Sequence, residues 1–135
     1  MNMKQSALLI ITSLLSILFM TFHLTSDTLR ARAGTSEAGG STLILVPFLV
    51  LWLYGTLVLA ERRSGYVIML VGSLLALGMP VIHTRGSAGF FHGAIAGSSG
   101  PFLFVWTLHV LGVLGMFALI LSVRGLWSLQ RREPR

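Results

Sequence analysis

Four long apolar stretches leave this chain few choices of fold. They cover about residues 6–24, 42–60, 66–83 and 101–123, and none of them contains Asp, Glu, Lys or Arg. About 20 mostly apolar residues are enough for a helix to cross the hydrocarbon core of a bilayer. Backbone groups in lipid must be hydrogen-bonded within their own segment, so each stretch is expected to cross as a helix. The sequence therefore predicts an all-α membrane protein, a four-helix transmembrane bundle in a single domain.

The composition supports a membrane location and excludes several functions. Of the 135 residues, 54% are hydrophobic and only 10% are charged, whereas a soluble domain carries about 25% charged residues. The net charge of +6 does not indicate nucleic-acid binding, because the basic residues lie at helix ends without an aromatic-basic surface. The chain has no cysteine. That excludes disulfides, thiolate metal sites and thiol redox chemistry.

The basic residues also predict an orientation. The short connection at 61–65 and the tail at 124–135 are basic, and Lys4 lies near the N-terminus. The two longer connections, 26–40 and 85–100, dilute their arginines with Gly, Ser and Thr. Cytoplasmic segments of membrane proteins carry an excess of Lys and Arg. Both termini are therefore predicted to be cytoplasmic and the two longer connections to be outer loops, in a bacterial inner membrane.

The first apolar stretch shares features with a secretory signal peptide. Lys4 precedes it, and the small residues of Ala31-Arg32-Ala33 follow it. In a signal peptide the cleavage site comes directly after the apolar run. Here the small residues lie well beyond that run, so the stretch is expected to remain as a helix.

The second outer loop carries two aromatic side chains, Phe90 and Phe91, between glycines. It is longer than two adjacent helices need. Two interpretations are equally open: a lid that dips into the interface, or a mobile loop with two lipid anchors.

The ionisable residues are expected to collect at the outer end of the bundle. His23 and His83 end the first and third helices, His92 lies in the second outer loop, and His109 lies two turns into the fourth helix. Asp27 follows His23 by four residues and shares its face if the helix continues. Ionisable groups within a membrane are costly, face the bundle interior and usually have a role. These five residues are therefore the candidate ligand-binding site.

Three stripes of residues at helical spacing are predicted to face the interior. They are Thr12, Ser16, Met20, His23 and Asp27 in the first helix, Gly72, Ala76, Pro80 and His83 in the third, and Val105, His109, Gly112 and Met116 in the fourth. Small residues let transmembrane helices approach closely. The predicted helix-packing positions are Gly72, Ala76, Gly112 and Gly115.

The residue types leave the ligand open. Imidazoles with a carboxylate suit Zn²⁺ or Cu²⁺, and two histidines from facing helices could ligate a haem b iron. His109 and Asp27 could instead relay protons in a small transporter, although no helix holds a deeply buried carboxylate. The sequence thus predicts a small membrane-integral binding or accessory protein. The alternative is a structural subunit that forms a homo-oligomer or joins a larger membrane complex through its glycine faces.

Overall fold

The computed structural model contains four helices in chain order. They are α1 (Met3–Arg32), α2 (Thr42–Leu57), α3 (Arg63–Gly86) and α4 (Ser99–Gln130). The structure describes residues 3–32, 42–86 and 99–131, without the side chains of residues 27, 30–32, 42–44, 82–86 and 99–103. Within these ranges the chain is helical apart from the turn that joins α2 to α3. The predicted all-α, four-helix fold is confirmed.

The helices are those of an integral membrane protein. Among the described residues, three apolar spans are long enough to cross a bilayer: Met3–Ser26 in α1, Arg63–Val81 in α3 and Phe104–Gln130 in α4. The second helix is different, because α2 has only 16 residues and its described apolar part runs over Leu45–Leu57. It is apolar but shorter than an ordinary transmembrane helix.

Several helix ends differ from the expected boundaries; α3, for example, begins at Arg63 rather than residue 66 and ends at Gly86 rather than residue 83. Helix α1 continues beyond residue 24 to Arg32, so the backbone of Asp27 is helical. Helix α4 continues beyond residue 123 to Gln130, so the start of the basic tail is helical rather than a separate segment. Both extensions contain few helix-breaking residues. Helix α2 ends at Leu57 rather than near residue 60.

A tight turn ends α2 early. The amide of Arg62 donates to the Leu59 carbonyl at 2.8 Å, and the amide of Tyr66 donates to the Arg62 carbonyl at 3.1 Å. These bonds bring the chain back so closely that a Cβ on Gly65 would overlap the Leu59 carbonyl oxygen. Glycine is the residue that permits this approach of two backbone segments.

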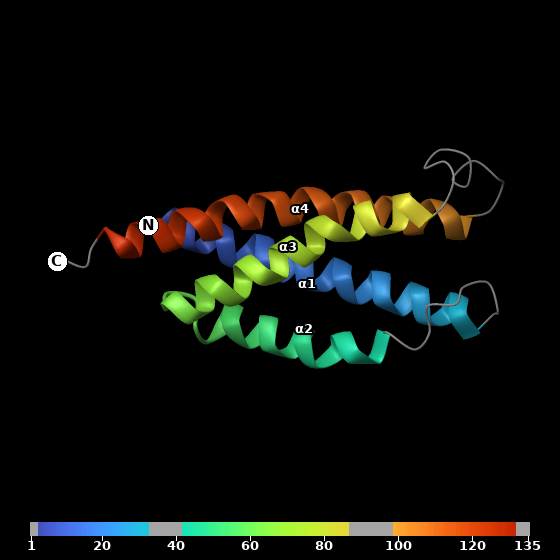
Figure 1. Cartoon of the computed structure of the whole chain (residues 1–135), viewed down its shortest axis with the longest axis horizontal. Helices are drawn as coiled ribbons and strands as arrows, with labels where there is room; N and C mark the ends of the chain where they lie inside the picture. The colour runs from blue at the N-terminus through green and yellow to red at the C-terminus, as the bar shows by residue number, and fades with distance from the viewer. Residues whose placement is uncertain (1–2, 33–41, 87–98, 132–135) are drawn as a thin grey trace.

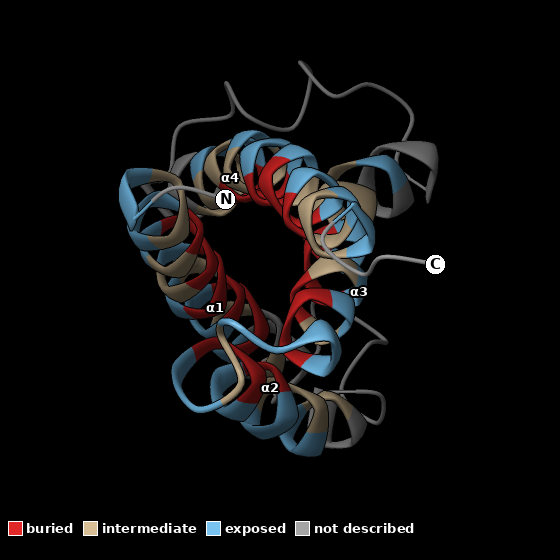
Figure 2. Ribbon diagram, turned by 90° about the vertical axis from the view of Figure 1, so that its left-hand side faces the viewer, coloured by how far each residue is buried: buried red, intermediate tan, exposed pale blue. Residues whose placement is uncertain are grey.

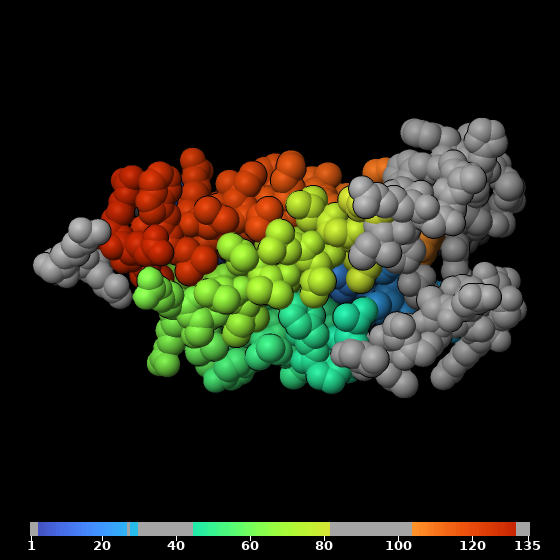
Figure 3. All heavy atoms as spheres, viewed as in Figure 1, coloured from blue at the N-terminus to red at the C-terminus, as the bar shows by residue number. Residues whose placement is uncertain are grey.

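The four helices form a closed ring in chain order. Figures 1 and 2 show α2 between α1 and α3, with α4 returning to pack against both α3 and α1. In Figure 3, α3 runs between α2 and α4 on one face of the bundle. Among the described residues α2 and α4 do not meet. The start of α1, the α2–α3 turn and the end of α4 all lie at the same end of the bundle (Figure 1). We call this end the basic end.

The buried residues lie on the sides of the helices that face the centre of the ring (Figure 2). On α1 the inward stripe contains Thr12, Ser16, Met20 and His23, each less than 10% exposed. Where α3 meets α4 the packing is close, because a Cβ on Gly115 would stand 3.0 Å from the Ala76 Cβ. Small side chains on both helices therefore set their separation.

The basic end carries Lys4, Arg62 and Arg63, and all three side chains are exposed. If this end is cytoplasmic, a cysteine in place of the exposed Ser64 should resist an impermeant maleimide added to intact cells and react after permeabilisation. Cysteines at Ser36 and Ser98, which lie outside the described residues, should react without permeabilisation. The native chain has no cysteine to interfere. If only Ser64→Cys were labelled in intact cells, the protein would have the opposite orientation.

Candidate functional site

His23 is a fully buried member of the inward stripe of α1. Its side chain is 0% exposed, and its ring lies against Phe104 of α4, with the ring centroids 4.9 Å apart and the planes tilted by 33°. The contact links the last turns of the α1 span to the first described side chains of α4. His23 is thus placed between two helices at the end of the bundle opposite the basic end.

His109 lies on the outer surface of the bundle, not in its interior. Its side chain is exposed, and its Nδ1 lies 2.8 Å from the Val105 carbonyl oxygen, one turn earlier in the same helix. A carbonyl oxygen can only accept, so Nδ1 carries the proton of this bond and Nε2 of the neutral ring is an acceptor. Met116, from the same predicted stripe, is 46% exposed. The inward orientation expected for His109 and Met116 is therefore wrong, whereas Val105 and Gly112 of the same stripe are half-buried.

The interior face of α4 is the neighbouring stripe. Its buried members are Leu108, Leu111, Gly115, Ala118, Leu121, Ser122 and Gly125. The small residues of this face let α3 come close enough that a Cβ on Gly125 would overlap the Tyr66 ring. Gly112 lies at the edge of the contact, where a Cβ would stand 3.1 Å from Pro80 Cγ. Close approach to α3 thus turns His109 outward.

The candidate ligands do not converge within the described part of the chain. His23 contacts Phe104, and His109 lies five residues after Phe104, which turns it about 140° around the helix. The described side chains contain no group of three His, Asp or Glu that could hold a metal ion. The side chains of Asp27 and His83, and the whole of His92, lie outside the description. A metal or haem site that includes them stays a prediction.

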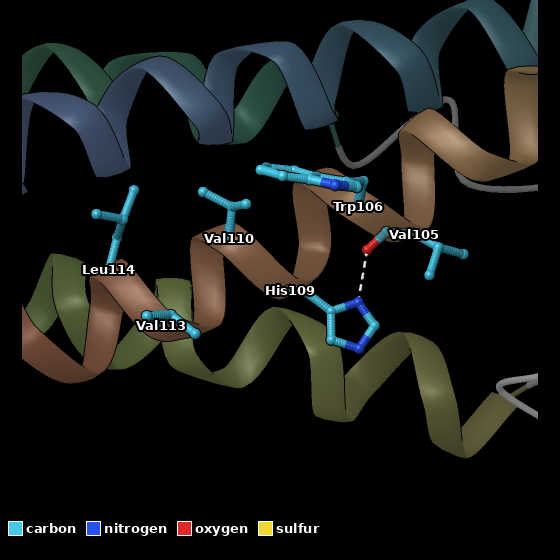
Figure 4. A pocket seen from close by; sticks show the side chains of 6 residues that line it. All are labelled: Val105, Trp106, His109, Val110, Val113 and Leu114. Carbon is cyan, nitrogen blue, oxygen red and sulfur yellow. Dashed lines mark hydrogen bonds between the residues drawn. The ribbon is translucent and has the colours of Figure 1, made fainter.

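His109 borders a hollow of about 470 Å³ on the outer face of α4. Figure 4 shows the side chains that form it as two rows along one helix: Trp106, Val110 and Leu114 in one, and Val105, His109 and Val113 in the other. Within each row the residues are four apart, so the hollow is a groove between two ridges of the kind that helices use to pack together.

A closed set of hydrogen bonds lies in the bundle centre, and no sequence pattern predicts it. Trp52 Nε1 donates to Ser13 Oγ at 2.9 Å, and Thr56 Oγ1 donates to the Trp52 carbonyl at 2.9 Å. Ser13 Oγ and Thr56 Oγ1 are 2.8 Å apart. Since the Thr56 proton is already used, Ser13 is the donor in this pair.

All three side chains of this set are 0% exposed. The indole lies flat against α3, because Gly72 has no Cβ and one placed there would overlap the ring. Polar groups in a membrane interior must be satisfied within the protein, and this arrangement satisfies the indole N–H and both hydroxyls. We interpret these hydrogen bonds as a structural link that holds α1 against α2 rather than as a reactive centre.

The chain was compared with protein families, with curated proteins and with solved structures, and no match was found.

Proposed function

We propose that this integral membrane protein is an accessory subunit of a bacterial inner-membrane assembly, and that it associates with a second copy of itself through α4. The observation that supports the proposal is the exposed His109 beside a groove on an otherwise apolar face. Met116, Ile120 and Val123 continue that face, and each is 46–48% exposed.

His109 lies at a depth where lipid is a poor neighbour for an imidazole. The 20 residue steps from Phe104 to Arg124 rise about 30 Å along the helix, which matches the hydrocarbon thickness of a bilayer. With Arg124 at one boundary, His109 lies about 8 Å inside the other. Polar side chains at such depths normally face protein or a water-filled cavity. A protein surface that covers His109 is therefore expected.

The shape of the groove favours a helix as that surface. Ridges formed by residues four apart fit into the grooves between equivalent ridges on a second helix. A second copy of α4 offers an identical set of ridges. In a parallel pair related by a two-fold axis, the same patch meets itself.

The chemistry of the groove is also self-complementary. His109 Nε2 is an acceptor, and Trp106, one turn away and 51% exposed, carries an indole N–H donor. Each copy thus offers a donor and an acceptor to the other. A single polar residue in an apolar helix seam commonly fixes the register of the pair.

Disulfide cross-linking in membranes tests the proposal. Val113→Cys in the groove is expected to give a cross-linked dimer, and Leu74→Cys on α3 is the matched control. The two side chains are 53% and 49% exposed, and each lies 11 residues from the basic-end arginine of its own helix, Arg124 or Arg63. Equal cross-linking at both positions, or none at Val113 at any protein-to-lipid ratio, would overturn the α4 interface.

A second experiment tests the role of His109 in the dimer. An interhelical hydrogen bond in a membrane contributes about 0.6–2 kcal/mol. A two-fold dimer contains two such bonds, so His109→Leu should weaken it roughly eightfold to several hundredfold, measured by energy transfer between labelled copies as lipid is added. Thermal stability of the monomer should change little, because the side chain is exposed. If association is unchanged, His109 does not contribute to the interface. If the protein associates only with a different membrane protein, the partner of α4 is not a second copy of this chain.

A further inference from the structure

The basic end of α4 carries a second hollow, separate from the groove at His109. It has a volume of about 190 Å³ and is lined by Arg124, Trp127, Ser128 and Arg131. These residues are three, four and seven positions apart, so they lie on one face of the helix. The helical extension of α4 to Gln130 creates this face, which an irregular tail would not present.

The two arginines are held in different ways. The Arg131 guanidinium lies over the Trp127 ring, 4.3 Å from its centroid, a cation–π contact that orients the charged group. Arg124 precedes Arg131 by seven residues, about 10 Å along the helix axis, and its side chain is exposed. Planar guanidinium groups bind phosphate oxygens through paired N–H donors. The hollow between them suits a phosphate group.

The charges around the hollow favour an anion. At the basic end the exposed charged side chains within the described residues are Lys4, Glu61, Arg62, Arg63, Arg124 and Arg131. Five of these six are basic, so the local potential attracts negative charge over roughly one Debye length.

The depth of the hollow favours a lipid as the source of that anion. Tryptophan prefers the membrane–water interface, and Trp127 is 57% exposed. With Arg124 at the hydrocarbon boundary, Arg131 lies about 10 Å outside it. The headgroup layer on each side of a bilayer is about 5–8 Å thick, so the two arginines bracket the level of the lipid phosphates.

We propose that Arg124 and Arg131, with Trp127 between them, bind the phosphate of an anionic phospholipid. Trp127 packs against the upper part of the acyl chains, and the guanidinium groups hold the phosphate from either side. The proposal does not rest on the α4–α4 association, because Trp127 lies about 27 Å along the helix from His109, although both lie on the same face of α4.

Thermal melting in a nonionic detergent, with phosphatidylglycerol added, tests the site. A lipid that binds the folded state raises the melting temperature by an amount that grows with the logarithm of its concentration over its dissociation constant. Phosphatidylglycerol should stabilise the protein, whereas phosphatidylcholine with the same acyl chains should not. Inorganic phosphate at matched phosphate concentration separates a lipid site from a free-anion site, and equal stabilisation by it would overturn the lipid assignment.

The matched variants remove equal charge from two places at the same end. Arg124→Gln/Arg131→Gln should weaken phosphatidylglycerol binding roughly a hundredfold or more, because it removes two charge-assisted contacts to the phosphate, whereas Arg62→Gln/Arg63→Gln removes only long-range attraction that salt screens and should weaken it much less. Both pairs are exposed, so both variants should fold, and their melting without lipid checks this. Equal losses in the two variants would show that charge at this end attracts lipid without a defined site, and stabilisation by phosphatidylcholine would exclude headgroup recognition.

Discussion

Replacing Gly115 by alanine is expected to lower the free energy of unfolding by about 1–3 kcal/mol. A Cβ at this position would stand 2.9 Å from the Leu77 amide nitrogen and 3.0 Å from the Ser73 carbonyl oxygen. These are backbone atoms of α3, so they cannot move aside without shifting the whole helix. The loss would be measured by reversible denaturation in detergent micelles.

Gly78→Ala is the control for this substitution. It makes the same chemical change on α3, where a Cβ would meet nothing within 4 Å. Alanine is a better helix former than glycine, so this variant should be more stable than the parent by about 0.5–1 kcal/mol. Opposite signs for the two Gly→Ala changes would support the close α3–α4 contact. Similar melting of the two variants would contradict it.

Ser13→Ala is expected to have a comparably large effect for a different reason. It removes the hydroxyl that accepts from Trp52 Nε1 and donates to Thr56 Oγ1. The buried indole N–H then has no acceptor in this set, at a cost of about 1–3 kcal/mol. Ser16→Ala is the matched control, because Ser16 is also 0% exposed but donates only to the Thr12 carbonyl of its own helix. Its loss should be roughly 0.5 kcal/mol or less.

A double-mutant cycle isolates the bond itself. Trp52→Phe removes the indole donor, so in the Ser13→Ala/Trp52→Phe protein neither partner is left alone. The two changes should therefore cost less together than the sum of the single changes, by about 1 kcal/mol. Strict additivity, or equal losses for Ser13→Ala and Ser16→Ala, would mean that the hydrogen bonds between α1 and α2 contribute nothing measurable.

The fold was predictable because the signals for it are local. Each apolar stretch specifies a helix by its own length and composition, without reference to the rest of the chain. The buried face of α1 was also predictable. Its polar residues Thr12, Ser16 and His23, together with Met20, differ from the aliphatic residues that prevail on its other sides.

The buried face of α4 was not predictable in the same way. This helix is apolar on all sides, so periodicity alone does not separate the lipid-facing side from the packed one. The outcome depends on where α3 brings its own small residues, such as Ala76, against Gly115. His109 suggested an inward stripe because polar residues usually face inward, and close packing of small residues determined the opposite.

The hydrogen bond between Trp52 and Ser13 was not predictable from the sequence for a related reason. The two residues are 39 positions apart and meet only when α1 and α2 pack side by side. Nothing in the sequence near either residue specifies the partner. The candidates Asp27, His83 and His92 are sequence predictions, and their side chains lie outside the described residues.

The unequal lengths of α2 and α4 give the bundle two different hydrophobic thicknesses. Helix α2, with 16 residues, is about 24 Å long, whereas the apolar part of α4, from Phe104 to Arg124, rises about 30 Å. The two lie on opposite sides of the ring and do not touch within the described residues. Lipids adjust to a short span by thinning and to a long one by thickening or by helix tilt. A bilayer around this protein is therefore expected to be thinner beside α2 than beside α4, which would favour placement at boundaries between membrane regions of unequal thickness.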